Sequence, residues 1–334
     1  MKISENILRN PVIQIGNVEV LNIGDPHLGK AFNQAFPDRR KDIVEHQWKV
    51  FKYFICHAPQ KIKVICGDIF DKSKVDESVL LRTAEILNNA SGEVIILEGN
   101  HDSSKTTLEK TSFDVLTQLV SPNPNIKVVR GIETKAIGGE LVTFIGWEYH
   151  HNIREQIEQN GILDVEYYYT HVDFESFNQD KSNTVPFDLL KQYGAKYVIN
   201  GHEHLPKRSH IDGIDYIGTG SILPFDRSQQ HESDQNTYAD LFVNVYQEDQ
   251  DYSLDYIDKF VYFHSSDFCE VPEFIGSYGV ILKKVTDLEE DKPVVLEFDE
   301  ISIPQLLSKA AEITGLDSDS VKQLVEEFEK VESE

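Results

Sequence analysis

The chain has 334 residues, 40% of them hydrophobic, and three cysteines without a CxxC pair. This length allows one large domain or two to three smaller ones, and the cysteine pattern argues against a disulfide framework. No apolar stretch is long enough to span a bilayer, and the N-terminal residues lack the charged, apolar and small-residue pattern expected of a secretory leader. We therefore expect a cytoplasmic protein that is not associated with a membrane.

The net charge of -25 is unevenly distributed along the chain. Residues 1–228 carry 31 acidic and 25 basic residues, a net charge of -6, whereas residues 229–334 carry 26 and 7, a net charge of -19. Carboxylates of the first part would be neutralised by any metals that they bind. The charge of the whole chain is therefore weak evidence against a nucleic-acid substrate, and it gives no support for one.

Taken in chain order, residues 1–17 are expected to form an irregular or β lead-in. The basic cluster Asp38-Arg39-Arg40-Lys41 precedes an amphipathic helix and suits either a phosphate contact or a solvated helix start. The later patterns predict helices over Glu77–Asn89, Phe113–Val120 and Pro186–Tyr193, strands over Val142–Ile145 and Ala239–Tyr246, and a hairpin over Ser209–Ile217. Strands that alternate with helices, followed by a hairpin, predict a layered α/β sandwich.

Five apolar runs end in residue types that bind metals. The clearest, Val94–Leu97, is typical of a buried parallel strand and leads into Gly99-Asn100-His101-Asp102. In open α/β sheets, ligands bind at the carboxyl ends of the strands. The other four runs lead into Asp25-Pro26-His27, Gly67-Asp68-Ile69-Phe70-Asp71, His171 and Gly201-His202-Glu203-His204. One such run could be a turn with a satisfied histidine, but five with the same layout indicate a shared site.

The character of the chain changes after Gln247. Short β-like runs separated by polar, acidic sequence predict a small second domain, and residues 303–331 predict two amphipathic helices. We therefore divide the chain into a lead-in (1–17), a main domain (18–248), a small cap (249–300) and a helical segment (301–334).

The ligand types indicate the chemistry. Mixed Asp, His and Asn ligands suit ions such as manganese or iron, because structural zinc prefers thiolates. The ligands are too many for one ion and suit two ions roughly 3.5–4 Å apart that share one carboxylate. Such a pair activates water and holds a phosphoryl group for in-line displacement, while a histidine assists the leaving oxygen.

These segments together resemble the motif set of calcineurin-like metallophosphoesterases. The segments Asp25–Gly29 and Gly67–Asp71 and the loop after Tyr216 are more closely similar to the SbcD-type nucleases, a group that includes a phage recombination nuclease subunit. These nucleases work with ABC-type ATPases on DNA double-strand breaks. The resemblance covers about residues 18–248. It implies an α/β (α+β layered) fold, in which a four-layer β-sandwich core carries a small C-terminal cap and a terminal helical pair.

The resemblance also implies the site residues. One metal ion would be held by Asp25, His27, Asp68 and His204, and the other by Asp68, Asn100, His171 and His202. His101 would be the acid or the stabiliser of the transition state. Asp71 stands where some relatives carry a histidine, so it is a second catalytic candidate or a support for the ligands. The expected cofactors are two Mn²⁺ ions, with Mg²⁺ or Fe²⁺ as alternatives.

The function implied by the resemblance is an exo- or endonuclease acting on double-stranded DNA ends. Its partner would be a coiled-coil ABC-type ATPase bound by residues 301–334, and the nuclease would be a homodimer. Two rival functions stay open, a phosphoesterase of small nucleotides and a non-catalytic scaffold subunit. A protein phosphatase is disfavoured, because Asp71-Lys72-Ser73 and Asp102 replace the Asp-Arg-Gly and Glu of that group.

Other histidines and aromatic residues allow two interpretations. His150 and His151 could be ligands, but no predicted strand places them at the site, which favours an ordinary loop. His210 lies in the hairpin and is expected to have no role. The run Tyr167–Tyr169 could stack on bases, but alternation within a strand favours packing in the core.

Overall fold

The computed structural model describes residues 9–32, 40–106, 109–147, 153–160, 162–174, 184–225, 242–246, 260–265 and 279–284. All of them belong to one compact unit, Met1–Lys284. Within these ranges no helix has both the length and the apolar character needed to cross a membrane. The two predicted terminal helices, most of the predicted cap, and His150 and His151 lie outside the described residues, so these remain predictions.

A five-stranded sheet forms the first half of the fold, in the order β1-β2-β3-β4-β5. Strands β2 to β5 run parallel, and β1 is an antiparallel edge strand. Parallel strands buried on both faces need continuous apolar sequence, which is the pattern that predicted β4. The strands are β1 (Val12–Ile15), β2 (Val18–Ile23), β3 (Ile62–Ile65), β4 (Glu93–Leu97) and β5 (Ile126–Val129).

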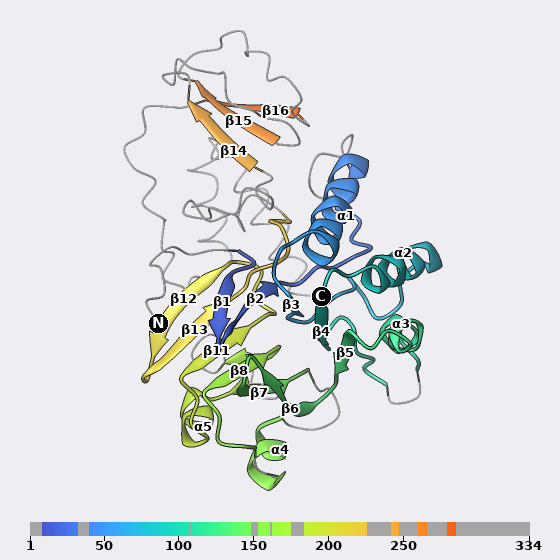
Figure 1. Cartoon of the computed structure of the whole chain (residues 1–334). Helices are drawn as coiled ribbons and strands as arrows, with labels where there is room; N and C mark the ends of the chain where they lie inside the picture. Colours follow the sequence, from blue (N-terminus) through green and yellow to red (C-terminus); the bar gives the residue numbers. More distant parts are fainter. Residues whose placement is uncertain are drawn as a thin grey trace, which may run out of the picture. The chain divides into compact units, whose positions relative to one another are not determined.

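Three helices between these strands cover one face of the sheet (Figure 1). They are α1 (Arg40–Cys56), α2 (Glu77–Asn88) and α3 (Ser112–Val120). Helix α3 begins at a capping box, in which Thr111 and Asp114 each accept a main-chain N–H of the other residue. The apolar sides of the helices bury Phe51, Leu87 and Phe113 against the sheet.

A six-stranded sheet forms the second half, in the order β12-β13-β11-β8-β7-β6. The four central strands are parallel, and β6 and β12 pair antiparallel at the edges. Asp212 and Gly213 make the predicted hairpin turn, both with positive φ. The outer face packs on α4 (Ile153–Asn160) and α5 (Phe187–Gln192). The strands are β6 (Ile132–Ile137), β7 (Glu140–Ile145), β8 (Tyr167–Thr170), β11 (Tyr197–Asn200), β12 (Lys207–Ile211) and β13 (Ile214–Gly218).

A separate core lies between the two sheets, because side chains alternate along each strand. In β3, Val64 faces the opposite sheet while Ile65 faces the helices, and Ile95 and Ile96 of β4 divide in the same way. From the second sheet, Phe144 and other apolar residues complete this inner core. Helices, sheet, sheet and helices make four layers, which confirms the predicted fold class.

Residues 9–17, the described part of the expected irregular or β lead-in, contain strand β1 and belong to this body. Strand β1 pairs with β2 along its whole length. The side chain of Arg9 is fully buried, and its Nη1 donates to the carbonyl oxygens of His204 and Ser221, both at 2.9 Å. The buried guanidinium therefore ties the start of the chain to the loops that follow β11 and β13.

Five further strands belong to two small sheets. The pair β9 (Asp173–Phe174) and β10 (Thr184–Val185) is parallel. A parallel three-stranded sheet contains β14 (Phe242–Tyr246), β15 (Phe260–Ser265) and β16 (Gly279–Lys284). Residue 248 is the predicted boundary between the main domain and the cap, and strands from both sides of it pair in this sheet. The domain boundaries remain predictions.

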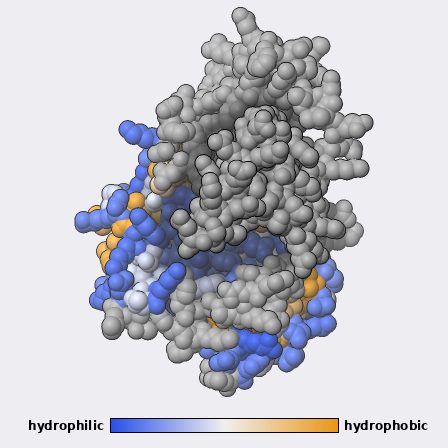
Figure 2. Space-filling view, turned by 180° about the vertical axis from the view of Figure 1, so that it is seen from behind, coloured by the Kyte–Doolittle hydropathy of each residue, from blue (hydrophilic) through white to orange (hydrophobic). Residues whose placement is uncertain are grey.

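The described surface is mostly hydrophilic on the face drawn in Figure 2, where hydrophobic areas are small and separate. Large apolar side chains that are exposed, such as Val12, Leu141 and Leu163, come from different elements. Scattered apolar residues of this kind are normal for a protein surface.

Candidate metal centre

Strands β2, β3 and β4 of one sheet and β8 and β11 of the other all end near one another. Within each sheet the parallel direction places the carboxyl ends at one edge. His171, after β8, joins the two edges, because its Nδ1 lies 2.7 Å from the carbonyl oxygen of Cys66, after β3. A carbonyl oxygen only accepts, so Nδ1 donates a hydrogen bond and Nε2 is the ring nitrogen that faces the site.

Glycines allow the loops to approach one another closely. A Cβ atom on Gly67 would lie 2.1 Å from Nδ1 of His171, and one on Gly99 would lie 2.1 Å from Oδ1 of Asp68. No side chain fits at either position, so glycine is required for the histidine and the carboxylate to reach the centre.

Three of the predicted ligands have a left-handed backbone. The φ angles are 44° at His27, 47° at Asp68 and 70° at His202. Each such residue costs on the order of 1–3 kcal/mol, and strain of this kind is concentrated at functional sites. The fold therefore holds these side chains in place at a cost in stability.

The first cluster contains Asp25, His27 and His204, whose ligand atoms lie within 4.8 Å of one another. The Nε2 atoms of the two histidines are 3.0 Å apart, and Asp25 Oδ2 is 3.9 Å from Nε2 of His204. Asp25 is fully buried, and its Oδ2 has no hydrogen-bond donor among the described residues. A buried carboxylate oxygen without a donor is costly unless a cation binds it.

The second cluster contains Asp68, Asn100, His171 and His202. Oδ1 of Asn100 is 3.0 Å from both Nε2 of His171 and Nδ1 of His202. Asp68, His171 and His202 also offer ligand atoms within 4.8 Å of one another. All four predicted residues of the second position thus meet.

Asp68 lies between the two clusters and faces both. Its Oδ1 is 3.4 Å from Nε2 of His171, and its Oδ2 is 3.6 Å from Nε2 of His27. The side chain is 2% exposed, and Oδ1 also accepts the main-chain N–H of His101 at 2.8 Å. One carboxylate thus directs one oxygen at each group of histidines, as a ligand shared by two ions would do.

The charges of the site are strongly coupled. Burial alone would lower the pKa of His171, but the carboxylates of Asp68 and Asp25 raise it to about 10. Burial would raise the pKa of Asp68, but His171 and His27 hold it below its usual range. The cause of the shift at His171 is the negative charge of the two buried carboxylates, and a divalent cation that displaced the proton of His171 would neutralise the same charge.

The residues therefore fit a pair of divalent ions. The pKa of His204 is lowered to about 3 by burial and by His27, which favours the neutral imidazole that binds metals. Nitrogen and oxygen donors occur together, without a thiolate ligand, in the donor sets of both clusters. Such mixed donors are typical of manganese or iron centres in metal-dependent hydrolases.

His101 stands at the edge of the centre, within 4.8 Å of ligand atoms of His27 and Asp68. Its Nδ1 lies 2.6 Å from the carbonyl oxygen of Asp71. Nδ1 therefore donates to this carbonyl, and Nε2 is the atom left for a substrate.

Asp71 contacts the ligands rather than the reacting position. Its Oδ1 is 3.2 Å from Nζ of Lys30 and 3.5 Å from Nδ1 of His27. Burial would raise the pKa of Asp71, but His27 and Lys30 lower it to about 2. An ionised carboxylate cannot donate a proton, so this geometry favours the supporting role for Asp71.

Asp102 connects two of the ligand loops without facing the metal clusters. The fully buried carboxylate accepts main-chain N–H groups from Ile69, Phe70 and Gly99 at 3.0–3.2 Å. Burial and the charge of Asp68 raise the pKa of Asp102 well above its usual range. The residue thus holds the Asp68 loop against the Asn100 loop.

Two residues of the site were not predicted. Oδ1 of Asp173 is 3.0 Å from Nε2 of His202, and the Trp147 ring stacks on His202 with centroids 5.3 Å apart. A carboxylate on the far nitrogen of a ligand histidine orients the ring and makes it more basic. Trp147 comes directly after β7. The same expectation that residues at the carboxyl ends of strands line the site could therefore have identified it. For Asp173, the only indication in the sequence was its position two residues after the predicted ligand His171.

The remaining histidines and aromatic residues of interest lie elsewhere. His210 is in the β12–β13 hairpin, with its Nδ1 2.7 Å from Oδ1 of Asp215. Tyr168 and Tyr169 are fully buried, and their hydroxyls donate to the carbonyl oxygen of Tyr193 and to Oδ1 of the buried Asn22. These two tyrosines therefore pack in the core and cannot stack on bases.

The four-layer fold with a histidine and carboxylate centre between its sheets defines a metallophosphoesterase. Residues 18–206 match the calcineurin-like phosphoesterase family, and the chain belongs to this family. A curated relative, exonuclease subunit 1 of Enterobacteria phage T4, is 27% identical over 214 residues. The match covers 60% of this chain and 59% of the phage protein, less than two thirds of its length.

Solved structures are similar only at a general level. A phosphopantetheinyl hydrolase of Mycobacterium tuberculosis is 12% identical, with a TM-score of 0.40, over 64% of this chain and 93% of that chain. An archaeal phosphodiesterase is 15% identical, with a TM-score of 0.30, over 60% of this chain and 83% of that chain.

Proposed function

We propose that the chain is a two-metal-ion DNA nuclease that hydrolyses phosphodiester bonds at DNA ends during recombination and break repair. The observation that carries the proposal is the position of Asp68, whose two oxygens face two groups of histidines. Membership of the phosphoesterase family and the similarity to a phage exonuclease subunit support it.

The residues divide into two ligand sets that share Asp68. Asp25, His27 and His204 would hold one manganese ion with it, and Asn100, His171 and His202 the other. When bound, the ions would supply a nucleophile from water and neutralise charge on the phosphoryl group. The neighbouring carboxylates fix the ligand rings, Asp71 beside His27 and Asp173 beside His202.

His101 would act on the oxygen that leaves. The carbonyl of Asp71 fixes the ring through Nδ1, so that Nε2 is presented beside the metal clusters. As an imidazolium, His101 can donate a hydrogen bond or a proton from Nε2 to the departing alkoxide. The imidazole then regains its proton from solvent.

Metal dependence tests this function. Protein freed of metal should not cleave duplex DNA, and manganese should restore cleavage much better than magnesium. The physical reason is the imidazole-rich donor set, since magnesium favours oxygen ligands. Cleavage of end-labelled duplex DNA over a titration of each ion measures this.

The same assay distinguishes the rival functions. Equal activity with both ions would contradict the ligand sets as assigned. Preference for small cyclic or linear nucleotides over DNA would favour the nucleotide phosphoesterase. A scaffold would cleave none of these substrates at any metal concentration.

Residues 301–334 form the proposed docking element for a coiled-coil ABC-type ATPase, and we also propose a homodimer in the cytoplasm. The segment lies outside the described residues, and its sequence carries the argument. Short amphipathic helices are marginal in water, so the stripe with Leu324 and Phe328 has to pack on the protein or on a partner.

Substitution in the full chain tests the docking. The double variant Leu324→Asp and Phe328→Asp should abolish co-purification with the ATPase and preserve manganese-dependent DNA cleavage. Gln323→Asp is the control, because helical spacing puts Gln323 opposite the apolar stripe. Undiminished ATPase binding by the double variant would exclude these two residues as anchors.

A further inference from the structure

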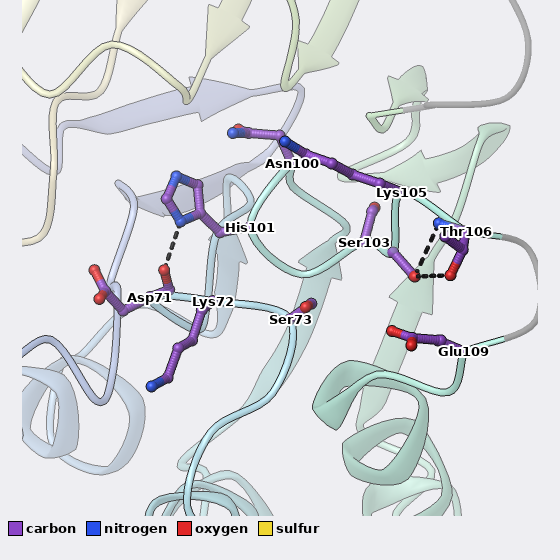
Figure 3. Close-up of a pocket in the computed structure, with 10 residues that line it drawn as sticks. Asp71, Lys72, Ser73, Asn100, His101, Ser103, Lys105, Thr106 and Glu109 are labelled. Carbon is purple, nitrogen blue, oxygen red and sulfur yellow. Dashed lines mark hydrogen bonds between the residues drawn. The ribbon is translucent and has the colours of Figure 1, made fainter.

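A pocket of about 510 Å³ lies beside His101. Its walls come from the loop segment 71–73 that follows β3 and the loop segment 100–106 that follows β4, and Glu109 completes the lining. Figure 3 shows these loops facing each other, with His101 hydrogen-bonded to Asp71 at one end. Ligand pockets commonly have volumes of roughly 300–1,000 Å³, so the volume is in the range of a nucleotide-sized ligand.

The pocket shares this end with the metal centre. Asn100 and His101 line the pocket, and the same two side chains contact the candidate ligands. A substrate whose scissile phosphate lay at the metals would therefore have its next groups close to the pocket on the His101 side.

Among the charged residues that line the pocket, those without an ion-pair partner in the described part of the chain are lysines. Its two acidic residues are paired with lysines that do not line it, Asp71 with Lys30 at 3.2 Å and Glu109 with Lys74 at 3.3 Å. Its own two lysines, Lys72 and Lys105, form neither an ion pair nor a hydrogen bond with the described part of the chain. Two exposed ammonium groups, one on each wall, are thus available to an anion.

Hydroxyl groups add to this anion-binding character. Oγ of Ser104 and Oγ1 of Thr106 are 3.3 Å apart in the wall that carries Lys105. A bond between them uses one of the two hydroxyl protons, and the other can be donated to an acceptor. Ammonium and hydroxyl donors together are the usual partners of phosphate oxygens in nucleic-acid backbones.

We propose that this pocket binds the leaving side of the substrate, with Lys72 and Lys105 on the phosphate next to the scissile one. The inference rests on the proposed function, because His101 marks the leaving side only if it acts on the leaving oxygen. The pocket then selects a polynucleotide strand over an isolated phosphodiester, which has no second phosphate to place there.

The test compares two substrates in the full chain with manganese, a DNA oligonucleotide and bis(p-nitrophenyl) phosphate. For the double variant Lys72→Ala and Lys105→Ala, the ratio of kcat/KM for DNA to kcat/KM for the small diester should fall roughly tenfold, through KM for DNA. The salt dependence of log kcat/KM for DNA should also weaken, with a slope smaller by roughly 0.7 per lost contact.

The control is Lys61→Ala, which removes the same charge at the amino end of β3, the opposite edge of the sheet. It should keep both the substrate ratio and the salt slope of the wild type. A double variant that behaves like this control overturns the pocket assignment, and so does an equal loss on both substrates. Wild-type protein that cleaves neither substrate overturns the proposed function itself. That result is distinct from failure of the pocket assignment, in which the wild type is active and the double variant behaves like the control.

Discussion

Replacing Asp68 with asparagine should release metal from both positions and abolish cleavage of DNA. The carboxylate directs Oδ1 at His171 and Oδ2 at His27, so one substitution weakens both ligand sets. Loss of residues that merely support metal ligands costs about 10- to 100-fold in affinity or activity, and loss of a shared ligand should exceed about 100-fold in metal affinity. Elemental analysis of the purified protein after dialysis measures the metal that remains per chain.

Asp102→Asn is the matched control, because Asp102 is an equally buried carboxylate in the adjoining loop. Its oxygens accept three main-chain N–H groups and belong to none of the candidate metal groups. The variant should lose about 1–3 kcal/mol of stability. Its folded fraction, checked by circular dichroism, should lose no more than the roughly 10- to 100-fold in metal affinity expected for a supporting residue and should therefore hold more metal than Asp68→Asn. Retention of both ions by Asp68→Asn would show that the carboxylate is not shared.

His101→Ala should retain both ions and lose a factor on the order of 10²–10⁴ in the rate of DNA cleavage. His101 lies beside the ligands, while its Nδ1 is held by the carbonyl of Asp71. Removing the ring therefore removes a donor to the leaving oxygen and leaves the two ligand sets intact. Single-turnover cleavage and metal analysis of the same preparation give both quantities.

Substrates with different leaving groups distinguish the two candidate roles of His101, general acid and stabiliser of the transition state. In bis(p-nitrophenyl) phosphate the departing phenolate needs little protonation, so an acid role predicts a much smaller loss on this diester than on DNA. Equal losses on both substrates would favour stabilisation of the transition state instead. His210→Ala is the control, since His210 pairs with Asp215 in a hairpin. Loss of metal from His101→Ala comparable to that from Asp68→Asn would make His101 a ligand.

Most helices and long strands could be predicted from sequence, because their apolar periodicity is local. The predicted helices over 77–89 and 113–120 match α2 and α3 to within one residue. Strand β5 was missed, because its four residues acquire a strand conformation by pairing with β4. Helix α4 was missed as well, since it has only eight residues and is largely polar.

Sequence patterns alone indicate that ligand-type residues follow five strand-like runs, and this common layout predicts one shared site. This follows from local pattern, since an apolar run shows where a strand ends and parallel strands end on the same side. The chain order does not determine which atoms face one another. The direction of each oxygen of Asp68, the support of His202 by Asp173 and Trp147, and the anchoring of the His204 loop by Arg9 all depend on how two sheets stack. Only tertiary structure decides them, because they join residues that are distant in the chain and that no local pattern relates.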